Sequence, residues 1–81
     1  MEVGFVKVYG IKMDSRCADL LEIVMKYATS GDSDVRETRR AALEKLGEYG
    51  CHKALIYIVD KLAKSGDSDA RETRRRALEL L

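Results

Sequence analysis

Residues 30–46 read SGDSDVRETRRAALEKL, and residues 65–81 read SGDSDARETRRRALELL. The two stretches lie 35 residues apart. Extending that offset aligns residues 15–46 with residues 50–81, and 19 of the 32 aligned positions are identical. Self-similarity at a fixed period is the signature of a repeat architecture. We therefore expect two copies of one supersecondary unit, residues 15–49 and 50–81, within a single domain that spans residues 1–81.

Each copy is predicted to contain two helices. Apolar residues recur at helical spacing in the first half of the second copy, at Ala54, Leu55, Ile58, Val59 and Leu62. A glycine then stands where a helix C-terminus favours a left-handed residue. Asp34 with Glu37, and Asp69 with Glu72, have the spacing of a capping box with Asp as the cap. The predicted helices span residues 15–29, 34–47, 51–64 and 69–81.

These features predict an all-α fold. We expect two stacked helix-turn-helix repeats of a short α-solenoid, with an atypical N-terminal helix or extended segment over residues 1–14. One helix pair cannot bury its apolar face alone, so a neighbouring pair must cover it. Such similar copies are expected from a recent duplication and equally from design with idealised repeats. Cys17, Cys51, His52 and four tyrosines argue against design, and both origins stay open.

One pattern marks the second helix of each copy: an Asp, then Val-Arg, then Ala-Leu and Leu-Gly in the first copy, with Ala70 in place of Val in the second. Its residues are Asp32, Val35, Arg36, Ala42, Leu43, Leu46 and Gly47, and then Asp67, Arg71, Ala77, Leu78 and Leu81. The pattern resembles the HEAT repeat family over roughly residues 15–81, and it departs from that family at Arg39 and Arg74. The resemblance implies a non-enzymatic scaffold that binds other proteins. It also implies that Asp32 reaches Arg71 of the next repeat.

The N-terminal segment, MEVGFVKVYGIKMD over residues 1–14, does not follow the repeat. Its β-branched and aromatic residues have weak helix propensity and also fit the alternation of a strand. We favour a helix, because packing against the following helix can override propensity. A strand would need a partner from a second chain, because the rest of this one offers none. Four side chains either cover the end of the stack or form an interaction surface: Phe5, Val8, Tyr9 and Ile11.

Seven of the eight arginines fall in the second helix of each copy, at Arg36, Arg39, Arg40, Arg71, Arg74, Arg75 and Arg76. On neighbouring helices they would form a basic ridge near helix N-termini, which favours phosphate, RNA or an acidic peptide. The candidate anion-binding residues are Arg36, Arg40, Arg71 and Arg75. The favoured interpretation is a solvated face of local pairs, namely Glu37–Arg40, Arg40–Glu44, Glu72–Arg75 and Glu72–Arg76. Arg39 and Arg74 are expected to cover the core with their stems and hold their heads in water.

Cys51 and His52 suggest a metal site or a nucleophile, but neighbours on a helix point about 100° apart and cannot chelate one ion together. A nucleophilic Cys also needs a base and an orienting group. We therefore expect Cys17 and Cys51 to be structural, partly buried thiols, reduced in a cytosol. Four carboxylates lack the pattern of a calcium loop and are interpreted as helix caps: Asp32, Asp34, Asp67 and Asp69. We expect no catalytic residue, metal or cofactor.

The composition is that of one small domain with nearly balanced charge, since 81 residues hold 15 basic and 14 acidic side chains. Apolar runs are too short to span a membrane and the start does not resemble a signal peptide, so we expect a cytoplasmic protein if the chain is natural. Apolar residues near both ends favour a homo-oligomer: Val3, Phe5, Val6, Leu78, Leu80 and Leu81. The expected function is a non-catalytic structural or protein-interaction module that self-associates. The alternative is anion or nucleic-acid binding through the arginines.

Overall fold

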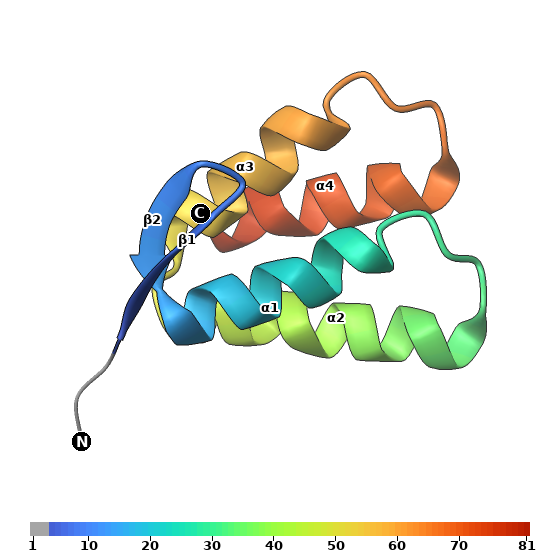
Figure 1. Ribbon diagram of the computed structural model, residues 1–81. Coiled ribbons are helices and arrows are strands. Elements are labelled where there is room, and N and C mark those ends of the chain that lie inside the picture. The colour runs from blue at the N-terminus through green and yellow to red at the C-terminus, as the bar shows by residue number, and fades with distance from the viewer. Residues whose placement is uncertain (1–3) are drawn as a thin grey trace.

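The computed structural model describes residues 4–81. Within that span the chain forms β1 (Phe5–Val8), β2 (Ile11–Asp14), α1 (Ser15–Lys26), α2 (Ser33–Glu48), α3 (His52–Leu62) and α4 (Ser68–Leu80). The helices form two hairpins, α1–α2 and α3–α4, whose loops lie at the end of the molecule opposite the strands (Figure 1). The predicted helices are confirmed to within a few residues at each end. The fold is mainly helical, with a small antiparallel sheet added.

The second helix of each hairpin is capped by an earlier Asp than the capping-box pattern predicts. Asp32 caps α2 by accepting hydrogen bonds from two backbone N–H groups of the first turn, at 3.0 and 3.1 Å. Asp67 caps α4 by accepting one such bond at 2.9 Å. The capping role predicted for Asp34 and Asp69 is therefore wrong. Asp32 and Asp67 have the extended backbone that an N-cap requires, which leaves the Asp69 carboxylate free for another contact.

The helix favoured for the N-terminal segment is wrong for residues 5–14, which form a β-hairpin. Phe5 pairs with Asp14 and Val8 with Ile11, in an antiparallel register. The two residues between the strands, Tyr9 and Gly10, have φ angles of 50° and 78°, as tight hairpin turns with the twist of the flanking strands require. Each strand therefore finds its partner within the segment itself, so no second chain is needed for pairing. Val3, expected to be exposed, lies outside the described residues.

The core lies between the helices. α1 packs beside α3, and α2 packs beside α4, so the two hairpins contact each other along their length (Figure 1). Five side chains with no exposed surface form its centre: Leu21, Val24, Leu46, Leu55 and Ile58. α2 and α4 approach closely at Gly47, where a Cβ would lie 2.8 Å from Cδ2 of Leu80.

The β-hairpin packs on α1 and α3 and places Met13, which is 5% exposed, in the same core. It therefore covers one layer of the helices, the layer that α1 and α3 form. Among residues 4–81, no helix is both long enough and apolar enough to cross a bilayer.

Candidate interaction surfaces

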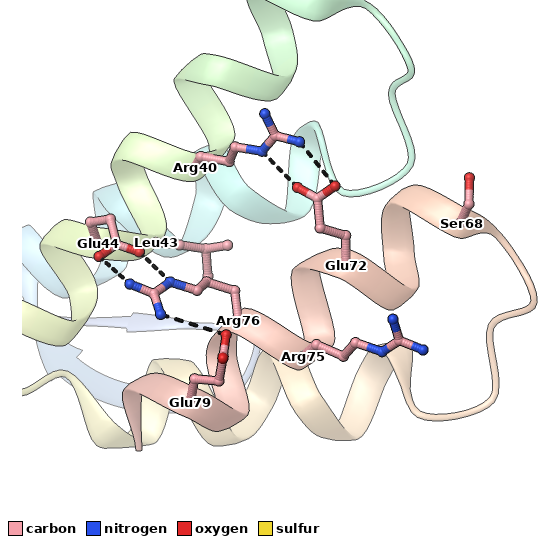
Figure 2. A pocket seen from close by; sticks show the side chains of 8 residues that line it. All are labelled: Arg40, Leu43, Glu44, Ser68, Glu72, Arg75, Arg76 and Glu79. Atoms are coloured by element: carbon pink, nitrogen blue, oxygen red, sulfur yellow. Dashed lines mark hydrogen bonds and ion pairs between the residues drawn. The ribbon is translucent and has the colours of Figure 1, made fainter.

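α2 and α4 are joined by a set of ion pairs, here called the α2–α4 ladder. Its members are Arg36–Asp69, Arg40–Glu72 and Glu44–Arg76. In each pair two guanidinium nitrogens donate to the two carboxylate oxygens, at 2.7 and 3.2 Å, 2.6 and 3.0 Å, and 2.5 and 2.6 Å respectively. Figure 2 shows the second and third pairs crossing from one helix to the other. Bidentate pairs of this kind fix the geometry as well as the charge of a contact.

The ladder corrects the local pairing that the sequence predicts. Arg40 and Glu72, each assigned to a neighbour on its own helix, pair with one another across 32 residues. The Asp32–Arg71 contact implied by the HEAT resemblance is also wrong, because the Asp32 carboxylate caps α2 and Arg71 makes no ion pair within residues 4–81. A local pair contributes only about 0.2–0.5 kcal/mol, whereas the packed helices allow two charge-assisted hydrogen bonds per pair. The available signal was opposite charges recurring 32 or 33 residues apart.

Arg39 lies at the centre of this polar interface and is completely buried. One terminal nitrogen donates to the backbone oxygens of Tyr27 and Ser30 at 3.1 and 3.2 Å. The other lies 3.4 Å from carboxylate oxygens of both Asp69 and Glu72. The prediction that its head reaches water is wrong, because carboxylates of α4 and the carbonyls of Tyr27 and Ser30 face its two terminal nitrogens, while Nε is buried with no partner within residues 4–81. Arg39 thus connects the α1–α2 loop to the second hairpin.

The ladder shifts the acid–base equilibria of its members. The hydrogen bonds from Arg36 lower the pKa of Asp69 below its ordinary value of 3.8, against the opposing effect of burial. Arg40 likewise lowers the pKa of Glu72, and Arg76 that of Glu44, below the ordinary 4.5. A carboxylate with a lowered pKa stabilises the fold above its ordinary pKa and loses that contribution as the pH falls through the shifted one. The ladder is therefore fully charged at neutral pH.

The four arginines predicted to bind anions divide into two sets. Arg36 and Arg40 are occupied by the ladder. Arg71 and Arg75 are exposed and make no ion pair or side-chain hydrogen bond within residues 4–81. With Leu78, which is 52% exposed, they stand at positions i, i+4 and i+7 of α4, on one side of the helix. We call these three residues the α4 stripe.

A groove of about 510 Å³ runs between α2 and α4. Its walls carry the second and third pairs of the ladder. Arg75 extends along the groove toward the start of α4 and pairs with none of the other side chains shown there (Figure 2). The other guanidinium groups of the groove already face carboxylates, so the groove presents a nearly neutral surface. Such a surface favours neither a phosphate group nor a free cation.

The four N-terminal residues predicted to interact do not form one exposed patch. Val8 and Ile11 are half-buried and pack against the core. Tyr9 is 49% exposed, and its ring stacks on that of Tyr57 with centroids 4.7 Å apart. Phe5, 66% exposed, projects most freely. Three of the four thus attach the β-hairpin to the helices, which leaves Phe5 as the accessible member of the set.

The two cysteines form a disulfide, Cys17–Cys51, which joins the start of α1 to the residue before α3. The expectation of two reduced thiols is wrong, because the two sulfur atoms are bonded to each other. The 35-residue offset places both residues near the same end of the stack, where parallel helices bring their Cα atoms to 5.7 Å. His52 is exposed beside this bond. Within residues 4–81, His, Cys, Asp and Glu side chains form no group of three that could hold a metal ion.

No model of a protein family matches this chain, and no similar chain is found among curated proteins or solved structures.

Proposed function

We propose that this chain is a non-catalytic protein-interaction module, built as two stacked hairpins of a HEAT-like α-solenoid. The layering supports the stacking, because α1 lies beside α3 and α2 beside α4. The side-chain chemistry supports binding rather than catalysis. The strongest charged cluster, the α2–α4 ladder, is engaged in holding the two hairpins together.

The α4 stripe is the observation that carries the proposal. Two arginines without acidic partners in the described chain stand beside Leu78, and Leu81, 48% exposed, follows at the end of the helix. Exposed apolar side chains flanked by polar residues, arginine among them, are typical of a surface that another protein covers. The complementary surface must offer carboxylates at the spacing of one helical turn, next to apolar groups. We propose that a second copy of the chain supplies that surface.

Light scattering at increasing protein concentration tests this function. We expect a mass above the 9.1 kDa of one chain, rising with concentration. Leu78→Asp should return the mass to that of one chain, because it places a charge in the apolar part of the α4 stripe. Phe5→Asp is the matched control: it changes a side chain on the β-hairpin that is even more exposed than Leu78, and it should leave the association intact. A constant mass of one chain at all concentrations would contradict the proposal.

Anion or nucleic-acid binding is the second candidate, and it now rests on Arg71 and Arg75. Two phosphate contacts would make binding weak and only about tenfold weaker between 50 and 200 mM salt. Leu78 lies in the same stripe, and no aromatic residue of α4 offers a surface for base stacking. We expect a fluorescent single-stranded oligonucleotide to show no saturable change in anisotropy at either salt concentration. Saturable binding that Arg71→Glu removes would favour this second function.

A further inference from the structure

We propose that copies of this chain join head to tail, the outer side of the α3–α4 hairpin of one copy docking on the outer side of the α1–α2 hairpin of the next. The contact would repeat the interface that already joins the two hairpins within one chain. This inference rests on the proposed self-association and specifies its geometry.

The charges support this arrangement. Within the chain, Arg36, Arg39 and Arg40 contact acids of α4. The positions 35 residues later are again arginines, Arg71, Arg74 and Arg75. Of these three, Arg74 donates to the backbone oxygen of Ala63 at 2.9 Å, and none makes an ion pair with any residue between 4 and 81. The second hairpin therefore presents the same donors to solvent that the first presents to α4.

The matching acids occur on the other side of the molecule. Asp69 and Glu72 receive the arginines within the chain, and the residues 35 positions earlier are Asp34 and Glu37. Both are exposed, and their carboxylates make no ion pair in the part of the chain that the structure describes. Asp34 and Glu37 can thus receive arginines of a second chain, in the way that Asp69 and Glu72 receive arginines of their own chain.

Apolar residues at equivalent positions differ in the same way: one member of each pair is buried and the other is exposed. Leu43 and Leu46, 1% and 0% exposed, correspond to Leu78 and Leu81, which are 52% and 48% exposed. On the first helices, fully buried Leu21 corresponds to Ile56, which is 56% exposed. Each exposed residue of the second hairpin therefore has an equivalent in the first hairpin that the second hairpin covers.

The receiving side is also open. Leu55 and Ile58 are fully buried, whereas their counterparts Leu20 and Ile23 are half-buried and line shallow depressions on α1. Thr73 has no exposed surface, and its counterpart Thr38 is exposed. The β-hairpin therefore leaves the outer side of α1 and α2 accessible to a docking chain.

These two surfaces differ in charge and belong to different hairpins, so each fits the other rather than itself. An interface of this type is heterologous and builds an open chain of copies instead of a closed dimer. The third pair of the α2–α4 ladder and the disulfide are not repeated. Ala41 replaces Arg76, and His52 replaces Cys17, at the corresponding positions. The contact between copies should therefore be weaker than the one within a chain, and reversible.

Charge reversal on each surface tests the proposal by sedimentation and light scattering. Arg71→Glu with Arg75→Glu blocks the arginine surface, and Asp34→Arg with Glu37→Arg blocks the acidic surface. Each double variant alone should associate at least roughly tenfold more weakly than the unmodified chain. An equimolar mixture should associate again, because one variant keeps the acids and the other keeps the arginines. Circular dichroism should show the same helix content in both.

The control is Lys7→Glu with Lys12→Glu, which also reverses two charges. Lys7 and Lys12 pair across the β-hairpin and are both exposed, outside the two proposed surfaces. This control should associate as the unmodified chain does. Association that survives either double variant, or a mixture that stays monomeric, overturns the head-to-tail geometry while leaving self-association in place. An unmodified chain that is itself monomeric overturns both proposals.

Discussion

Replacing Arg39 by Ala is expected to destabilise the fold by about 3 kcal/mol. Arg39 is fully buried and supplies hydrogen bonds to two backbone oxygens, of Tyr27 and Ser30. A hydrogen bond from a charged donor contributes about 1.5–3 kcal/mol. We take the lower value for each, because both carbonyls lie beside a loop where water can partly replace the guanidinium. The longer contacts to Asp69 and Glu72 add little, since each acid keeps a bidentate partner.

That loss is large for this molecule. A chain of 81 residues is expected to unfold with about 4–12 kcal/mol, and 3 kcal/mol corresponds to a fall in melting temperature of roughly 12–24 °C. Urea unfolding followed by circular dichroism measures the free energy, and the matched control is Arg74→Ala. Arg74 occupies the equivalent position but makes one hydrogen bond, to Ala63, at the surface of the hairpin. We expect that control to cost less than about 1 kcal/mol.

The difference in free energy of unfolding between the two variants tests whether burial between the hairpins makes Arg39 important for stability. Equal costs for Arg39→Ala and Arg74→Ala would refute it, because the difference between them is assigned to burial between the hairpins. A loss below about 1 kcal/mol for Arg39→Ala would refute it as well, since the two carbonyls would then not depend on the guanidinium. An unchanged urea m-value would show that both variants unfold from the same compact state.

Three further predictions concern stability. Ile58→Ala should cost about 2–5 kcal/mol by leaving a cavity in the core, whereas Ile56→Ala, at a largely exposed position, should cost less than about 1 kcal/mol in the same urea assay. Reducing the Cys17–Cys51 bond, which closes a loop of sequence separation 34, should lower the free energy of unfolding by about 4 kcal/mol; an unchanged melting temperature in dithiothreitol would contradict this. The melting temperature should hold from neutral pH down to about pH 5 and fall below pH 4, as the carboxylates of the α2–α4 ladder are protonated. Replacing those carboxylates by amides should reduce the fall in melting temperature below pH 4. An unchanged fall would exclude the ladder as its cause.

The helices could be predicted from the sequence because their signals are local. Apolar spacing, a following glycine and an Asp before each second helix all fall within one turn of the element they define. The helix favoured for the N-terminal segment is wrong although the signals of the β-hairpin are also local. The alternation within residues 1–14 fits a strand whose partner is expected from a second chain, whereas the two-residue turn at Tyr9 and Gly10 supplies that partner within the segment.

The polar contacts could not be predicted because they depend on how the helices pack. The charges of the α2–α4 ladder are evident in the sequence, but their partners become apparent only when α2 and α4 lie side by side in register. The head of Arg39 is predicted to lie in water because nothing in its own helix indicates that α4 supplies two carboxylates to it. The disulfide could not be predicted for the same reason. A sequence separation of 34 residues does not indicate how far apart the two cysteines lie until the packing of the two hairpins is known.

The position of the Cys17–Cys51 bond has a mechanical consequence. A force applied to the two ends of the chain passes through the bond and bypasses the enclosed segment, which includes α2 and the part of α1 that follows Cys17. Fully extended, that segment would add about 120 Å of length at roughly 3.5 Å per residue; with the bond intact it adds only the 5.7 Å between the two Cα atoms. Under tension, the oxidised chain therefore yields mainly its β-hairpin and its last two helices, while the first pair remains shielded from the load.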